Sequence, residues 1–363
     1  MPRTSPAPEV TGVRVAYRRH PGPSGEEGGG DWADKIHLPG SRLVLVVGDV
    51  LGNGVPAPTV ADQFRSAVRV LTQLDLSPAQ VLHRLDVLAE SLGEQYISTC
   101  VYVICDLTDG TAVFSSAGHL PPLLRTPYDP AYRIALPVGP PLGVGGIHFE
   151  ERQYTIPPGS LLALYTGGLL GHAVDEDADT AIAELGHLLD KVEDVPDGQL
   201  DQICEHIDTV MLGNRAHTGD ATLLLAKLGR LPEADAAAWT LTARPTAVAQ
   251  ARDLIRDRLL AWGLHGHADV VELLVSELVT NALRYGIAPF GLRMTRGADS
   301  VTVEVSDGNP TVPRLRNVQV GDEGGRGLHL VDELSADWGV HSRTQGKTVW
   351  FTLGTGRTGG SSA

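Results

Sequence analysis

The sequence predicts an α+β fold in two domains, and three observations support this prediction. Short alternating or apolar runs, bounded by Gly, Pro and Asp, recur through residues 11–228, as expected for strands. Longer stretches with apolar residues at helical spacing lie between these runs. A polar stretch of small residues, 229–238, then separates this region from residues 239–355, where both patterns return. A chain of 363 residues is long enough to build two cores.

The first region is predicted to be a layered domain with helices on the faces of its sheets. Its predicted strands are SRLVLVVGDV, TCVYVICDLTDG, TAVFSSAGH, SLLALYTGG and ATLLLAKL. Its predicted helices are PTVADQFRSAVRVLTQL, SPAQVLHRLDVLAESLG and two more in residues 177–212, with a break near Pro196. Ser77 is suited to cap the second of these helices, with Pro78 at its first position.

The second region begins at about Trp239, after a segment, 229–238, that is expected to be a linker or a helical spacer. Its predicted helices are AVAQARDLIRDRLLAWG, which Thr246 can cap, and VVELLVSELVTNALRYG. Its predicted strands are FGLRMTRG, SVTVEVSDG and KTVWFTL. The two ends of the chain, 1–10 and 356–363, are rich in Pro, Gly or Ser and are expected to be flexible.

Composition excludes several classes of function. The net charge of −15 argues against a broad nucleic-acid surface, because phosphate binding needs clustered Lys and Arg. Three scattered cysteines without metal-ligand spacing indicate a reduced, cytoplasmic protein. The N-terminal residues lack the apolar core of a signal peptide, and no run approaches the ~20 apolar residues of a membrane span, so no membrane association is expected.

The polar pair Glu277 and Asn281 is the most informative feature of the second region. Residues four apart lie on the same face of a helix, so a carboxylate and an amide emerge together from an otherwise apolar element. The amide oxygen can bind Mg²⁺ beside nucleotide phosphates, and the carboxylate can act as a general base. A solvated helix face with ordinary polar residues is the alternative. Two glycine-rich segments follow, VSDGNP and EGGRGLHLVDEL.

Those segments complete a candidate ATP pocket. Asp307 ends a predicted strand, where its carboxylate can accept a hydrogen bond from the exocyclic amine of adenine; taken alone, Asp-Gly after a strand usually marks only a turn. The glycines from Gly324 to Gly327 precede a helical pattern, and their backbone N–H groups can approach phosphates at a helix N-terminus.

The order of these motifs resembles the GHKL (Bergerat) ATPase fold of histidine kinases, an α/β sandwich with a mixed sheet and helices on one face. ELVTNALRYG, SDGNP, EGGRGLHLV and GKTVWF resemble the serine/threonine-kinase anti-sigma factors in particular. Tyr285 departs from that pattern, which often has His there. The resemblance implies ATP with Mg²⁺ and the following roles: Glu277 as base, Asn281 as Mg²⁺ ligand, Asp307 as adenine contact, Gly325 and Gly327 along the phosphates, and Thr348 near the base.

In the first region, Asp31 and Asp49 are placed at a turn and at a strand end, where two carboxylates can hold a hard divalent cation. Two ordinary turn aspartates are the alternative. With STCVYVICDL, FSSAGHLPPLL and PPGSLLALYTGGLL, these segments resemble the SpoIIE-like branch of the PPM serine/threonine phosphatases, a β-sandwich flanked by helices. The resemblance implies two Mn²⁺ or Mg²⁺ ions that activate water, with Asp49 bridging them, the Val50 carbonyl adding an oxygen and Asp31 completing one site.

Two expected metal ligands are missing from this pattern. Where the family has Asp in YTDGL and in a DD-(A/I)-(T/A)-LL segment, this chain has Gly167 and Gly219. Asp220 remains, although the pattern makes it the second, non-ligating acid. Three interpretations stay open: a pseudophosphatase that only binds partners, altered metal use with one ion, and weak activity with Asp220 shifted inward. His119 lies in AGHLPP without an accompanying Ser or Cys nucleophile motif, so it is not expected to be catalytic.

The two resemblances together predict a cytoplasmic bacterial partner-switching regulator of sigma factor activity. The partner they imply is a STAS-domain anti-anti-sigma factor, with a sigma factor as a second candidate; a homodimer stays open. The rival hypothesis is a binding module in which ATP orders the Gly324–Gly327 loop without phosphate transfer. A sensor histidine kinase is disfavoured, because no helical hairpin with a phospho-acceptor His precedes the ATPase segment.

Overall fold

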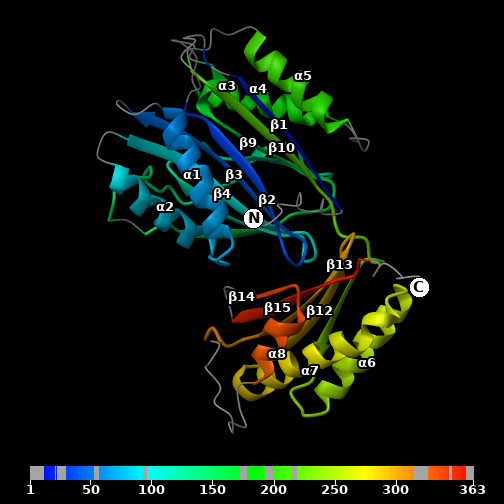
Figure 1. Ribbon diagram of the computed structural model, residues 1–363. Helices are drawn as coiled ribbons and strands as arrows, with labels where there is room; N and C mark the ends of the chain where they lie inside the picture. Colours follow the sequence, from blue (N-terminus) through cyan, green and yellow to red (C-terminus); the bar gives the residue numbers. More distant parts are fainter. Residues whose placement is uncertain are drawn as a thin grey trace, which may run out of the picture. The chain divides into compact units, whose positions relative to one another are not determined.

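The computed structural model describes residues 12–20, 22, 30–52, 57–92, 96–146, 148–171, 178–192, 199–213, 219–313, 326–342 and 346–356. The chain divides into two compact units (Figure 1). The first contains Gly12–Leu38 and Arg42–Arg230, and the second contains Pro39–Ser41 and the described residues from Leu231 onward. Within the described ranges, no helix is long and apolar enough to cross a membrane.

The first unit is a sandwich of two five-stranded antiparallel sheets. One sheet has the order β2 (Trp32–Leu38), β3 (Arg42–Gly52), β4 (Tyr96–Asp106), β5 (Thr111–Ala117) and β8 (Glu151–Thr155). The other has the order β1 (Val13–His20), β10 (Ala221–Leu228), β9 (Ser160–Tyr165), β6 (Leu123–Arg125) and β7 (Tyr132–Arg133). The predicted β-sandwich is therefore confirmed.

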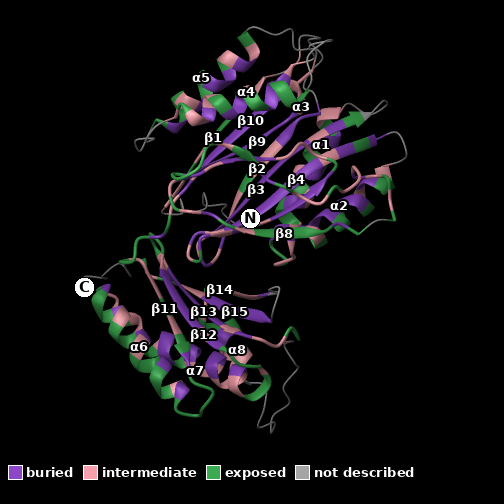
Figure 2. Cartoon of the chain, turned by 180° about the vertical axis from the view of Figure 1, so that it is seen from behind, coloured by how far each residue is buried: buried purple, intermediate pink, exposed green. Residues whose placement is uncertain are grey.

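Helices cover both outer faces of this sandwich (Figure 1). Helices α1 (Ala57–Thr72) and α2 (Pro78–Leu92) share one core with β2, β3 and β4. Helices α3 (Gly167–Leu170), α4 (Ala178–Asp190) and α5 (Leu200–Gly213) share another with β1, β9 and β10. Central strands such as β3 are buried on both faces (Figure 2), which explains why its sequence is a nearly continuous apolar run. Ser77 caps α2 as predicted, since the Gln80 N–H points to Ser77 Oγ at 3.5 Å and the Ser77 N–H donates to Gln80 Oε1 at 3.0 Å.

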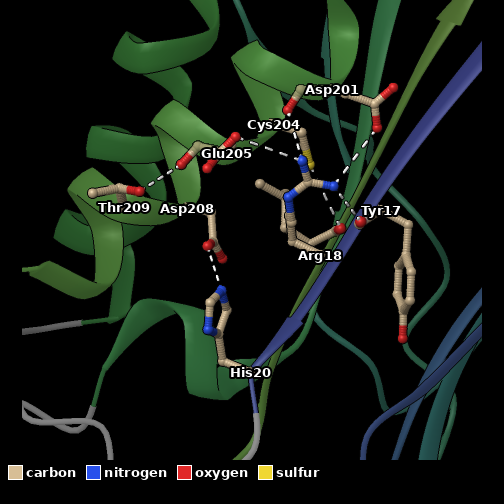
Figure 3. A network of polar contacts seen from close by, with 9 residues as sticks. Tyr17, Arg18, His20, Asp201, Cys204, Glu205, Asp208 and Thr209 are labelled. Atoms are coloured by element: carbon tan, nitrogen blue, oxygen red, sulfur yellow. Dashed lines mark hydrogen bonds and ion pairs between the residues drawn. The ribbon is translucent and has the colours of Figure 1, made fainter.

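A polar seam joins β1 to α5 (Figure 3). Arg18 donates to the Asp201 carbonyl at 3.2 Å and forms an ion pair with Glu205 at 3.8 Å. One turn further along α5, His20 Nε2 lies 2.5 Å from the carboxylate of the buried Asp208. The opposite face of β1 is therefore left to Tyr17 and Arg19, because alternate residues of a strand point to opposite sides.

The second unit is one five-stranded sheet with helices on one face (Figure 1). The strand order is β11 (Ala236–Leu241), β12 (Phe290–Arg296), β13 (Ser300–Asp307), β15 (Lys347–Gly354) and β14 (Asp337–Ser342). The helices are α6 (Ala247–Ala261), the short η1 (His265–His267), α7 (Ala268–Tyr285) and α8 (Arg326–Leu334). Apolar residues of α6, α7 and alternate positions of the strands form one core, as in Val301, Val303 and Val305. The predicted helix-covered layer is confirmed.

Several details differ from the sequence-based expectations. The sheet is antiparallel at every described pairing rather than mixed. Ala236–Ala238, expected in a linker or helical spacer, open β11, because pairing with β12 overrides the weak strand preference of alanine. Thr246 occupies the cap position of α6 without a side-chain hydrogen bond. The expected flexible ends, apart from Gly356, and the break near Pro196 lie outside the described residues.

Gly48 gives a test of the packing under the first site. A Cβ atom there would lie 2.5 Å from the ring of Trp32, which is buried and stacked on Phe64. We expect Gly48→Ala to lower the free energy of unfolding of the first unit by roughly 1–3 kcal/mol, because the ring must shift. Urea denaturation measures the loss, and hydrogen exchange should locate it in β2 and β3. Gly213→Ala, where an added Cβ meets open space, is the matched control and should be near neutral.

Candidate functional site

The pairing of β2 with β3 brings Asp31 and Asp49 together. Trp32 pairs with Gly48, and the Val50 N–H donates to the Gly30 carbonyl at 3.1 Å, so the same register sets Asp31 directly opposite Asp49. Opposite residues in an antiparallel pair project to the same face of the sheet. The sequence pattern placed Asp31 in a turn; it lies instead at the first position before β2, with its side chain buried.

Burial and mutual repulsion dominate the electrostatics of this pair. Burial, and then the neighbouring Asp49 carboxylate, raise the pKa of Asp31 to about 8. Burial also raises the pKa of Asp49. The Thr166 hydroxyl donates to Asp31 Oδ2 at 2.5 Å, and the Thr222 N–H donates to Thr166 Oγ1 at 2.9 Å. The carboxyl of Asp31 is thus held by a hydroxyl from the second sheet of the sandwich.

Asp220 lies close enough to raise the pKa of both other carboxyls, yet its own charge is already balanced. Its Oδ2 accepts a hydrogen bond from Arg19 at 3.1 Å, and its Oδ1 accepts one from the Gly22 N–H at 2.8 Å. Within the described residues, no group of three or more His, Cys, Asp or Glu side chains is arranged to hold a metal ion. The carboxylates of Asp31 and Asp49 thus lie together, whereas that of Asp220 is engaged by Arg19 and the Gly22 N–H.

The two glycines at the expected ligand positions leave space around them. A Cβ atom added at Gly167 or at Gly219 would meet nothing within 4 Å, whereas one at Gly168 would lie 1.7 Å from the Asp220 carbonyl oxygen. Neither Gly167 nor Gly219 has the positive φ that favours glycine. The fold therefore does not require glycine at either position.

His119 has a structural position between the two sheets. Its Nδ1 lies 2.8 Å from the Thr99 hydroxyl on β4, and its Nε2 lies 3.1 Å from the Tyr165 carbonyl on β9. Burial lowers the pKa of His119 to about 4, so the ring is neutral near pH 7. With both ring nitrogens engaged, His119 links the sheets next to Thr166.

In the second unit, α7 positions Glu277 and Asn281, both half-buried, one turn apart. The start of α8 packs on Glu277, since a Cβ atom at Gly327 would lie 2.4 Å from Glu277 Oε2. A side chain at position 327 would therefore have to displace the Glu277 carboxylate from its present place. The structure thus joins the candidate base to the glycine-rich segment. Gly324 and Gly325, the other expected phosphate contacts, lie outside the described residues.

The far end of α7 is fixed to the end of β13. The Gly308 N–H donates to the Ile287 carbonyl at 2.6 Å, and Asn309 Nδ2 donates to the Tyr285 carbonyl at 2.6 Å. Asp307, which is buried, lies directly before these contacts. From Glu277 to Tyr285 the helix rises about 12 Å. Gly327 and Asp307 therefore lie near opposite ends of this stretch of α7, with Asn281 between them.

The register of β13 with β15 places Lys347, rather than Thr348, beside Asp307. Asp307 pairs with Lys347, and Ser306 pairs with Thr348. Lys347 Nζ lies 3.0 Å from Asp307 Oδ1, so both side chains point to the same face. Thr348 must point to the other face, where its buried hydroxyl has no hydrogen-bond partner among the described residues. A shift of one residue reverses the face, so Thr348 points away from the Asp307 carboxylate, and its expected place near the base stays a prediction.

Three polar residues of these sites were not identified from the sequence: Thr166, Arg19 and Lys347. Each acts through a contact between segments far apart in the chain, with separations of 135, 201 and 40 residues. Lys347 directly follows a glycine at the start of a predicted strand. Pairing the start of that strand with the DGN turn would have placed Lys347 near Asp307.

The pairing of Asp31 with Asp49 predicts how the free energy of unfolding of the first unit depends on pH when divalent cations are absent. Because the pKa of Asp31 is about 8 in the folded protein and about 4 in an unfolded chain, the folded state binds an extra proton between these values. Its stability should therefore fall as pH rises from about 5 to 8. Asp31→Asn should flatten this dependence and raise the free energy of unfolding at pH 8 by roughly 1–3 kcal/mol. Thermal melts in EDTA measure both effects; an unchanged pH profile in the variant would contradict the paired arrangement.

Comparisons with known proteins agree with this architecture. Residues 39–229 match the family model of stage II sporulation protein E (SpoIIE), and residues 241–353 match the histidine kinase-like ATPase domain. A crystal structure of the RsbU and RsbW domains of a Mycobacterium tuberculosis protein is 26% identical, covers 95% of each chain and has a TM-score of 0.57. The PP2C phosphatase domain of SpoIIE from Bacillus subtilis, 15% identical over 61% of this chain and 64% of its own, shares the fold with a TM-score of 0.50. The chain belongs to the stage II sporulation protein E family, with a PP2C-type phosphatase domain followed by a histidine kinase-like ATPase domain.

Proposed function

We propose that this chain is a bacterial partner-switching regulator in which the ATPase domain carries the stronger chemistry. In this proposal it binds ATP with Mg²⁺ and phosphorylates a serine of a STAS-domain anti-anti-sigma factor. The observation that carries the proposal is the close approach of Gly327, at the start of α8, to Glu277. Glu277 is the candidate base, and it lies one turn before Asn281 on α7. The phosphatase domain, by contrast, lacks acids at two expected ligand positions.

In this proposal, residues on and next to α7 have separate roles in phosphate transfer. Asn281 offers an amide oxygen to Mg²⁺, and the backbone at the start of α8 offers N–H groups to the phosphates. Glu277 accepts the proton of the attacking serine hydroxyl. Asp307, at the far end of the helix, accepts a hydrogen bond from the base. Mg²⁺, when bound, supplies the charge that offsets the negative charge of the transferring phosphoryl group.

For the phosphatase domain, the proposal is a single cation held by Asp31 and Asp49, with the Val50 carbonyl as a further oxygen. The raised pKa of both carboxyls fits this assignment, because a divalent cation is what would relieve their repulsion. Thr166 orients Asp31 toward its partner. Arg19 keeps Asp220 engaged, which argues against an inward shift of Asp220 as a substitute ligand. Reduced or absent phosphatase activity follows.

The domain order supports a role in partner switching. The Mycobacterium tuberculosis structure joins an RsbU and an RsbW domain over the same length of chain, at 26% identity. A chain with both domains can act on the same STAS partner in opposite directions, and weakening the phosphatase removes futile cycling. The competing candidate is a module that binds ATP and controls a sigma factor or another partner by contact alone.

Two substitutions on α7 separate these candidates. We expect Asn281→Ala to abolish phosphate transfer to a STAS substrate and to weaken Mg²⁺-dependent ATP binding, because it removes the metal ligand. Glu277→Gln should keep ATP binding while lowering the transfer rate about 100-fold or more, since it removes the base. Radiolabel transfer and calorimetric ATP titration measure the two effects. Arg252→Gln, an exposed change on α6, is the control.

Phosphate transfer by the Asn281→Ala variant at the wild-type rate would contradict the proposed kinase activity. ATP binding by the wild type without transfer to any STAS protein offered would instead favour the binding module.

The open space at Gly167 and Gly219 allows a test by gain of function. We expect Gly167→Asp combined with Gly219→Asp to raise Mn²⁺-dependent hydrolysis of a phosphorylated STAS protein at least tenfold, because the added carboxylates complete a second cation site. The control is Gly213→Asp, which adds one carboxylate at another open position, away from Asp31 and Asp49 in the sequence. Phosphatase activity of the wild type at the level of the double variant would refute the proposed loss.

A further inference from the structure

Lys347 is a buried cation beside Asp307, the residue that is expected to meet the base. Its side chain is 7% exposed, and that of Asp307 is 2% exposed. Lys347 Nζ donates to Asp307 Oδ1 at 3.0 Å and to the Asn309 carbonyl at 2.9 Å. Buried ammonium groups need such partners, so the position of Lys347 is well determined by its surroundings.

The same carboxylate oxygen is shared by two donors. Asp307 Oδ1 also accepts the Asn309 N–H at 2.8 Å, which closes the turn after β13. The backbone around it is tightly packed: a Cβ atom at Gly286 would lie 2.7 Å from Asp307 Cγ, and one at Gly346 would lie 1.9 Å from the Asp307 carbonyl oxygen. An incoming base that donates to Oδ1 must therefore compete with Lys347.

We infer that Lys347 is a specificity-determining residue that competes with the 6-amino group of adenine for Asp307 and lets the pocket accept 6-oxo purines. The inference rests on the proposed nucleotide site. A 6-amino purine offers a donor to Asp307, and Lys347 opposes this contact by occupying one of the two carboxylate oxygens, Oδ1, and by drawing on the charge of the group. A 6-oxo purine offers an acceptor instead, to which the Lys347 ammonium can donate while it stays near Asp307. Lys347 thereby makes the preference for adenine over a 6-oxo purine smaller than it would be with the Asp307 carboxylate alone.

ATP and ITP make a suitable pair of probes, because their bases differ at position 6 and their sugar and phosphates are the same. Lys347→Met keeps the length of the side chain and removes the charge. We expect it to raise the ratio of the ITP Kd to the ATP Kd about tenfold or more over the wild type, by tightening ATP and weakening ITP. The ratio cancels any general effect of the lost positive charge on the triphosphate. Calorimetric titration with each nucleotide in Mg²⁺ gives the four constants.

Two further variants make the result specific. In an Asp307→Asn background, Lys347→Met should change the ratio less than threefold, because the competition requires the carboxylate. Arg252→Met removes one positive charge from an exposed position on α6 and should leave the wild-type ratio intact. Thermal melts of each variant confirm that it is folded.

The outcomes separate the inference from the proposed function. Binding of both nucleotides with an unchanged ratio in Lys347→Met overturns the inference and leaves the ATP site standing. A purely structural lysine would give the same result, with a lower melting temperature and equal losses for ATP and ITP. Failure of the wild type and of Lys347→Met to bind either nucleotide overturns the nucleotide site, and the inference with it.

Discussion

A buried carboxylate needs a positive charge or strong hydrogen-bond donors, and this constraint organises both domains. Asp220 meets it with Arg19, and Asp307 meets it with Lys347. Within the described residues, Asp31 and Asp49 are buried or half-buried beside each other without a Lys or Arg partner. The difference between these cases indicates which carboxylates the fold has already neutralised and which are left for an external cation.

Local sequence patterns were sufficient to predict the helices, the strands and the Glu277/Asn281 pair, whereas the β-sandwich and the sheet with helices on one face were expected from the family resemblances. Helical spacing and strand alternation are visible within a few residues, so they can be recognised without knowledge of the tertiary structure. The capping of α2 by Ser77 belongs to the same class. The expectation that Gly167 and Gly219 stand at ligand positions came only from resemblance to a family, since a glycine in a turn carries no signal of a missing carboxylate.

Contacts that depend on register could not be predicted in the same way. The face to which a strand residue points changes with a shift of one position, which is why Lys347 rather than Thr348 lies beside Asp307. The hydroxyl of Thr166 reaches Asp31 only because the two sheets of the sandwich stack. The antiparallel sheet of the second unit likewise follows from pairings between segments separated by helices, as in β11 with β12.

Charge balance also determines how many cations the phosphatase site can hold. A pair of divalent cations carries twice the positive charge that Asp31 and Asp49 can neutralise. Asp220 cannot make up the difference, because Arg19 already offsets its charge and the Gly22 N–H holds its second oxygen. A divalent cation held by Asp31 and Asp49 would supply Lewis-acid activation of a water molecule, and its charge would offset that of the two carboxylates. The open space at Gly167 and Gly219 shows that the fold itself does not require glycine at either position, so a carboxylate there would be compatible with the same backbone.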